Sequence, residues 1–233
     1  MIDMKRILFI VIIFCLISTQ SCYANTIEIQ VLYNLSDKLE YSTDSINKLK
    51  ILSAEFIEIN KSETFNPKLY NKLDSFIKNN KNSLSSLTAL HMIAGMCFWP
   101  ETFELYSKKG EQIINFLINN YSNYIHGKIA LIAKASILSK KGLNNEAISL
   151  LKDNYEVILN IEKDVNFKYF IQEMNLEFSD DKNIIAGFYH LLGSIYIDIK
   201  DYKNAALNLN KVINYYPETN YAKISKEMLK SIK

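Results

Sequence analysis

The stretch from Ala186 to Thr219, AGFYHLLGSIYIDIKDYKNAALNLNKVINYYPET, decides the fold of the chain. Its apolar residues recur at the spacing of two amphipathic helices, the first marked by Tyr189, Leu192, Tyr196 and Ile199 and the second by Ala205, Leu209, Val212 and Ile213. Asp201 and Tyr202 lie between the two sets, where the chain turns. The stretch therefore predicts a pair of helices that pack their apolar faces together.

Two residues indicate how this pair is built. Gly193 has no Cβ atom, which lets the second helix approach the first closely, and Pro217 ends the second helix because it has no N–H to donate. One such hairpin cannot bury its own apolar face and needs stacked neighbours. We therefore expect an all-α protein, an α-solenoid of antiparallel helix hairpins with about nine to eleven helices after the signal segment described below.

The same stretch resembles the tetratricopeptide repeat (TPR) family. With Ala186 as position 1, the family's signature positions 4, 7, 8, 11, 20, 24 and 32 fall on Tyr189, Leu192, Gly193, Tyr196, Ala205, Leu209 and Pro217. Only position 27, usually Ala, differs, since it is Val212 here. The resemblance implies stacked TPR-like hairpins and a function in binding another protein or a peptide.

The rest of the chain divides around this repeat. Residues 25–82 predict an N-terminal helical segment, with helices from Ile27 to Leu39, after Ser42-Thr43-Asp44 and after the cap Asn66-Pro67. Residues 83–161 predict divergent TPR-like hairpins, with Gly95 at a position that needs a small residue and a turn at Lys141-Gly142. Residues 162–185 exceed the repeat period and predict an inserted helix or linker. Residues 186–219 are the repeat, and 220–233 predict a C-terminal capping helix.

Residues 1–24 are typical of an export signal peptide. Lys5 and Arg6 precede an apolar run from Ile7 to Ile17, and Cys22-Tyr23-Ala24 supplies small residues for cleavage before Asn25. An alternative is a lipoprotein signal with the lipid on Cys22, although Thr19 stands where that signal has Leu. An uncleaved anchor is a third alternative, but the run is shorter than the roughly 20 residues of a membrane span.

The signal implies an exported protein, periplasmic or secreted, or anchored to the outer membrane if Cys22 is lipidated. After cleavage only Cys97 remains, so we expect a buried free thiol and no internal disulfide. The ending INYYPETNYAKISKEMLKSI agrees with export, because it resembles the repeats of TPR proteins in bacterial envelopes. These include the lipoprotein of the outer-membrane β-barrel assembly machine and the periplasmic coordinator associated with Tol–Pal.

Composition and motifs argue against several functional classes. The net charge is only +2 and Arg6 is the sole arginine, which gives no basis for nucleic-acid binding. His91, His126 and His190 are far apart in sequence and match no metal-binding or catalytic motif. The chain also lacks a nucleophile elbow and a glycine-rich phosphate loop. We therefore predict no enzyme activity, no metal and no cofactor.

The TPR resemblance also predicts where a partner binds. TPR proteins commonly hold peptides on the inner surface formed by the first helices of their hairpins, and that surface includes Gly187 and the candidate site residues His190, Ser194, Ile197 and Asp198. The Lys and Asn residues of a carboxylate clamp are absent from these positions. The alternative is that these residues are ordinary solvent-facing positions. Tyr215, Tyr216 and Tyr221 form either an aromatic ledge for a peptide or contacts between repeats.

These observations lead to three functional hypotheses. The first is an exported scaffold of the bacterial cell envelope that binds a protein partner without catalysis. The second is a structural or accessory subunit of an envelope assembly or secretion machine, anchored through a lipid on Cys22. The third is a helical enzyme or binding module that acts on glycans, which would need carboxylates or aromatic side chains clustered in one cleft.

Overall fold

The structure is a computed structural model and describes residues 35–36, 38–60, 65–98, 102–174 and 181–232. Within these residues the chain forms eleven α-helices, one short 3-10 helix and no strand, apart from an isolated bridge between Glu40 and Ser83. The helices are α2 (Thr43–Asn60), α3 (Pro67–Asn79), α4 (Ser85–Met96), α5 (Phe103–Tyr121), α6 (Ile125–Lys140), α7 (Asn144–Asp153), α8 (Tyr155–Leu159), η1 (Ile161–Lys163), α9 (Phe167–Glu173), α10 (Asp181–Asp198), α11 (Tyr202–Tyr215) and α12 (Asn220–Ser231). The predicted all-α class and helix number are confirmed.

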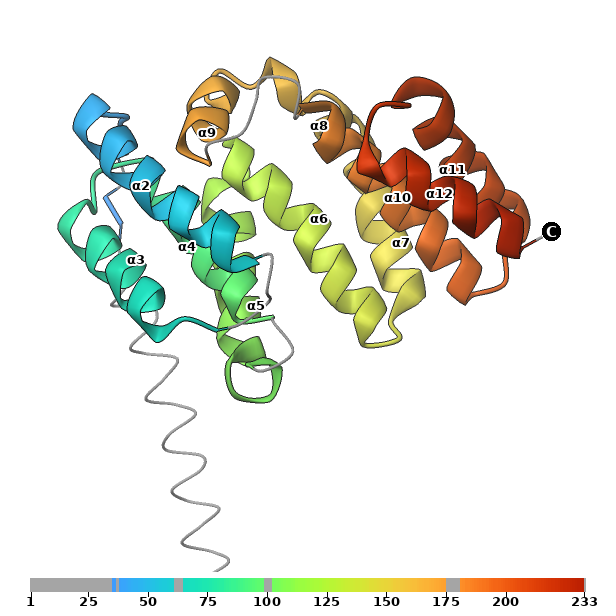
Figure 1. Cartoon of the computed structure of the whole chain (residues 1–233), viewed down its shortest axis with the longest axis horizontal. Helices are drawn as coiled ribbons and strands as arrows, with labels where there is room; N and C mark the ends of the chain where they lie inside the picture. Colours follow the sequence, from blue (N-terminus) through green and yellow to red (C-terminus); the bar gives the residue numbers. More distant parts are fainter. Residues whose placement is uncertain (1–34, 37, 61–64, 99–101, 175–180, 233) are drawn as a thin grey trace, which may run out of the picture.

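The helices stack as an α-solenoid (Figure 1). The pairs α2–α3, α4–α5, α6–α7 and α10–α11 pack as hairpins, and α12 packs against both helices of the last one. The first helix of each hairpin also packs against the first helix of the next: α2 contacts α4, α4 contacts α6, and α6 contacts α10. Helix α12 continues this row by its contact with α10. We call the surface formed by this row the inner face.

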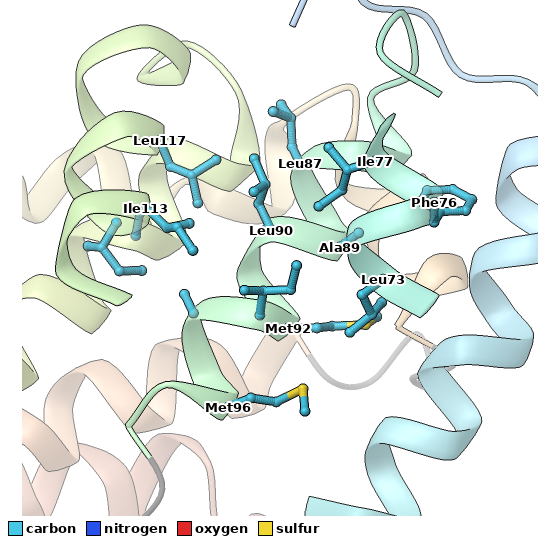
Figure 2. Packing of buried hydrophobic residues seen from close by; sticks show 14 of the residues in the cluster. Leu73, Phe76, Ile77, Leu87, Ala89, Leu90, Met92, Met96, Ile113 and Leu117 are labelled. Atoms are coloured by element: carbon cyan, nitrogen blue, oxygen red, sulfur yellow. The ribbon is translucent and has the colours of Figure 1, made fainter. Parts of the chain in front are cut away.

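The helices bury two hydrophobic clusters, one in each half of the solenoid. Figure 2 shows Leu73, Phe76 and Ile77 of α3 on one side of α4, and Ile113 and Leu117 of α5 on the other. All five side chains are buried. Farther along the chain, α6 contributes Ala130 and Ile137 to this cluster and Ile125 and Ala135 to a second one that also contains α7, α10 and α11. A single helix thus joins both halves of the solenoid.

The α10–α11 hairpin forms as its sequence predicts. A Cβ atom added to Gly193 would lie 2.6 Å from Leu209 Cδ2, so the close approach of the two helices requires glycine. Asp201 caps α11 by accepting a hydrogen bond from the Asn204 N–H, after Lys200 turns the chain with φ of 61°. The prediction for Ile199 was wrong, because α10 ends at Asp198 and Ile199 lies in the following turn, where it is 39% exposed.

Local signals place the other helix ends. The Asn66 side chain accepts hydrogen bonds from the backbone N–H groups of Lys68 and Leu69 and Pro67 opens α3, as predicted. Gly142, with φ of 76°, turns the chain between α6 and α7. Gly95 departs from its predicted role, because a Cβ atom there would meet only Phe56, at an ordinary 3.6 Å. In this hairpin the close approach occurs instead at Gly110, where a Cβ atom would lie 2.7 Å from the Phe98 ring.

The helix predicted from Ile27 to Leu39 does not continue into its described end. Residues 35–36 and 38–39 are not helical. The backbone N–H groups of Ser36 and Glu40 donate to the carbonyl groups of Lys81 and Asn82, so this segment bonds to the turn between α3 and α4 instead of to itself. The remainder of the predicted helix, the signal peptide and Cys22 lie outside the described residues.

The inserted residues 162–185 contain α9 and the first turn of α10, which begins at Asp181. Helix α9 returns across the inner face and packs against α2 and α4 (Figure 1). Cys97 is a buried free thiol, as predicted, and burial raises its pKa to about 11. Within the described part of the chain, no helix is both long and apolar enough to span a membrane.

Candidate functional site

A groove on the inner face between α6 and α10 is the candidate site. Its volume is about 440 Å³, and Tyr221 of α12 also lines it. The lining is mostly apolar or small: Ile129, Ile132, Ala133 and Ser136 of α6 face Asn183, Ile184, Gly187, His190, Leu191 and Ser194 of α10. Such a groove offers apolar contact area and a few polar groups, which is the composition of sites that bind peptide side chains.

Contacts between α10 and α12 hold Tyr221 beside the groove. His190 Nδ1 lies 3.0 Å from the hydroxyl oxygen of Ser225, and the His190 ring lies 5.2 Å from the Tyr221 ring, centroid to centroid. A Cβ atom added to Gly187 would come within 3.2 Å of the Tyr221 ring, so glycine leaves room for this aromatic side chain. Burial lowers the pKa of His190, so its imidazole is neutral at pH 7.

A second hollow of about 190 Å³ lies beside the groove, between α4 and α6. Ala133 and Ser136 of α6 line both spaces. The two hollows therefore adjoin the same stretch of α6, and we refer to them together as the channel. Lys140 and Lys141 border the smaller hollow, and Lys141 pairs with Glu111 at 2.6 Å. The channel thus has an apolar lining with positive charge at one edge.

The structure places the predicted site residues in two groups. His190 and Ser194 line the groove, whereas Ile197 and Asp198 lie farther along α10, outside its lining. Asp198 is exposed and Ile197 packs against the core of the C-terminal half.

The three tyrosines proposed as a ledge also separate. Tyr221 lines the groove, Tyr215 is 70% exposed, and Tyr216 packs 6.3 Å from Tyr189, ring to ring. The contact of Tyr216 with Tyr189 lies within one repeat, whereas Tyr221 lines the groove and also packs against the second core cluster.

A buried polar cluster beneath α9 had no counterpart in the sequence predictions. Thr88 of α4 donates a hydrogen bond to Glu173 Oε2 at 2.5 Å, and its hydroxyl oxygen lies 2.9 Å from His126 Nε2 of α6. His91 Nε2 donates to the His126 carbonyl oxygen at 2.8 Å. The contact of Thr88 with Glu173 spans 85 residues of sequence, and its contact with His126 spans 38. No local sequence motif could therefore have predicted this cluster.

Burial controls protonation in this cluster. It raises the pKa of the Glu173 carboxyl to about 7, although the hydrogen bond from Thr88 partly offsets the shift. Burial also lowers the pKa of His91 to about 4 and that of His126 well below its usual value, so both imidazoles are neutral at pH 7. Thr88, His126 and Glu173 are fully buried, so their arrangement joins helices and offers no access to a substrate.

No group of three or more His, Cys, Asp or Glu side chains in the described ranges is arranged to hold a metal ion. The channel has a mostly apolar lining. Comparison with known families identifies the segment that forms one wall of it. Residues 186–219 match the family described as tetratricopeptide repeat.

This segment is a tetratricopeptide repeat. The match has the same boundaries as the stretch from which the sequence analysis started, and it comprises most of α10, all of α11 and the turn before α12. No curated protein and no solved structure matches the chain significantly. TPR hairpins generally act in protein–protein interaction, so the repeat supports a role as a protein-binding scaffold.

Proposed function

We propose that the protein is a non-catalytic scaffold of the bacterial cell envelope that holds an extended or helical segment of a partner protein in the channel. The observation that carries this proposal is the groove between α6 and the first helix of the TPR repeat, where His190 and Ser194 face apolar side chains of α6. Its volume of about 440 Å³ is enough for a few side chains of a bound segment.

The lining defines the chemistry of the partner segment. Ile129, Ile132, Ile184 and Leu191 offer apolar contacts, and neutral His190 and Ser194 offer hydrogen bonds. The groove lining itself contains no charged side chain. The partner segment is therefore expected to insert apolar side chains, with any acidic residues directed toward Lys140 at the edge of the channel, since Lys141 pairs with Glu111.

The location in the envelope rests on the signal-like residues 1–24 and on the resemblance of the C-terminal stretch to envelope TPR repeats. In the structure, part of that stretch forms α12. Thr219 caps α12 through its hydroxyl group, and the small side chains of Ala222 and Ser225 are buried where α12 packs against the repeat. A lipid anchor on Cys22 is the second form of the proposal, with the same channel and a membrane-bound chain.

A bulky substitution in the groove tests the proposed function. Ser194→Trp places an indole in the groove, and Ser149→Trp places the same side chain on the exposed surface of α7 as a matched control. Residues 25–233 of each variant are used to capture partners from an envelope extract, and circular dichroism confirms equal helix content. We expect a reproducible partner to be lost with Ser194→Trp and retained with Ser149→Trp. Equal retention by both variants would place binding outside the groove.

A further inference from the structure

Helix α9 occupies the inner face as a bound peptide would. It belongs to the segment inserted between two hairpins, and it is not a member of any hairpin pair. It packs on α2 and α4, which are first helices of their hairpins, and its chain neighbours α8 and α10 lie toward the other half of the solenoid (Figure 1). The face that carries the channel in the C-terminal half is thus covered by α9 in the N-terminal half.

The contacts of α9 are those of a short amphipathic helix in a groove. Phe167, Phe170 and Ile171, spaced i, i+3 and i+4, are buried, whereas Lys168 is exposed. The Tyr169 ring stacks on Tyr41 with 4.3 Å between centroids. The side chains that a separate peptide would use for recognition are therefore supplied by the chain itself.

The C-terminal end of α9 is fixed by polar contacts to two first helices. Ser53 of α2 donates a hydrogen bond to the Glu173 carbonyl oxygen, and Thr88 of α4 donates to the Glu173 carboxyl group. At the other end of the segment, Asp164 pairs with Lys128 of α6 at 2.6 Å. These contacts bridge sequence separations of 120, 85 and 36 residues.

Two aromatic contacts place α9 beside residues of α4 and α6. The Phe170 ring lies edge-on to the rings of His91 and His126, at centroid distances of 6.3 and 5.6 Å. His91 also lines the hollow between α4 and α6. His91 therefore lies between this hollow and the buried Phe170 of α9.

We propose that α9 is an intramolecular ligand of the inner face, which covers the α2–α4 part of the binding surface until a competing amphipathic segment displaces it. The competitor carries the pattern of α9 itself: aromatic or large apolar residues at i, i+3 and i+4, followed by a carboxyl group two residues later. Displacement lengthens the open channel from α6, α10 and α12 to include α2 and the buried side of α4.

Two features make this helix separable from the hairpins. Seven residues are too few for a helix to be stable alone, so α9 depends entirely on its docking contacts. The docking surface is also imperfect, because Tyr41 Oη and His126 Nδ1 are buried without a hydrogen-bond partner among the described atoms. A competitor that forms hydrogen bonds with these atoms would bind the docking surface more tightly than α9 does.

The test supplies α9 in trans. A labelled peptide of residues 164–174 is titrated against residues 25–233 of the unaltered chain and of a chain with Phe170→Ala, and a peptide with the same substitution is the matched control. Since loss of a buried Phe side chain costs roughly 3–5 kcal/mol, we expect the unaltered peptide to bind the Phe170→Ala chain at least about 100-fold more tightly than the unaltered chain. The control peptide should bind neither. Equal binding to both chains, or none to a Phe170→Ala chain of normal helix content, would overturn the proposal.

Native-state hydrogen exchange on the unaltered chain covers the case in which Phe170→Ala unfolds the protein. We expect the amides of Phe170 to Glu173 to exchange at least about tenfold faster than those in the middle of α4 and α6, because α9 opens without the hairpins. Exchange of all these amides at one common rate would show that α9 is an inseparable part of the core. The inference rests on the proposed function only for the identity of the natural competitor. The peptide is α9 itself, so this result stands whether or not the Ser194→Trp experiment succeeds.

Discussion

Two glycines to which the sequence assigns the same role respond oppositely to alanine. Gly193 and Gly95 both lie inside first helices of hairpins. A Cβ atom at Gly193 would lie 2.6 and 2.7 Å from Leu209 Cδ2 and Cγ, whereas one at Gly95 would meet only Phe56, at 3.6 Å. The first position has no room for a methyl group, and the second accepts one in ordinary van der Waals contact.

The magnitudes follow from two opposing terms. Alanine in place of glycine stabilises a helix interior by about 1 kcal/mol, and this gain is available at both positions. Overpacking a close contact costs ~1–3 kcal/mol, which applies only at Gly193 because Leu209 is fully buried and has to move. Gly95→Ala should therefore raise the free energy of unfolding by about 1 kcal/mol. Gly193→Ala should lower it by ~0–2 kcal/mol.

Thermal and urea unfolding, followed by circular dichroism at 222 nm, measure the difference. For a chain of this length 1 kcal/mol corresponds to roughly 2–4 °C in Tm, so the two variants should differ by several degrees. A double-mutant cycle with Leu209→Ala isolates the contact, because the cost of Gly193→Ala should disappear when Leu209 is truncated. A Gly193→Ala protein as stable as Gly95→Ala, or a cycle without coupling, would refute the close packing of α10 on α11.

Three further predictions concern other parts of the chain. Burial raises the pKa of Glu173 from 4.5 to about 7, so the contribution of this carboxyl group to stability is complete below about pH 4.5 and is lost as the pH rises to about 7. The difference in unfolding free energy between the unaltered protein and Glu173→Gln should therefore change by about 3 kcal/mol over this range. A difference that does not change with pH would contradict the burial of this carboxyl group. Asn66→Ala removes the cap of α3 and should cost about 1 kcal/mol in urea unfolding, against no change for the exposed Asn145→Ala. If Cys22 carries a lipid, labelling with a radioactive fatty acid should be lost in Cys22→Ala, and labelling that persists would exclude that anchor.

The contribution of the buried histidines to stability changes with pH in the opposite direction to that of Glu173. Burial lowers the pKa values of His91 and His126, so their contribution to stability is present above about pH 6.5 and is lost as the pH falls. The same loss occurs in the unaltered protein and in Glu173→Gln. Subtracting one curve from the other therefore leaves the contribution of Glu173.

The sequence predicted those features that local spacing determines. The hairpin of α10 and α11, its cap at Asp201 and the turn at Gly142 each depend on residues within a few positions of one another. A periodic apolar stripe and a capping side chain carry this information without knowledge of the remaining fold. The solenoid follows from the same signals, because unpaired hairpins need neighbours.

Contacts between distant segments could not be predicted in this way. Nothing near Glu173 in sequence indicates that its carboxyl group lies against Thr88, because the sequence between them includes three hairpin helices and the turns that orient them. The inserted helix was predicted, but its return to the inner face depends on partners in α2 and α4. Ile197 and Asp198 show the related limit at the site, because both follow His190 and Ser194 on α10, yet they are not among the residues that line the groove.

Site-specific photo-cross-linking from the groove tests the central claim most directly. A photoreactive amino acid is placed at Ser194 in the groove or at Ser149 on the exposed surface of α7, and the cells are irradiated before lysis. We predict a discrete cross-linked partner from position 194 that is absent from position 149. Cross-links of equal yield from both positions, or a discrete partner from position 149 alone, would contradict binding in the channel of the inner face.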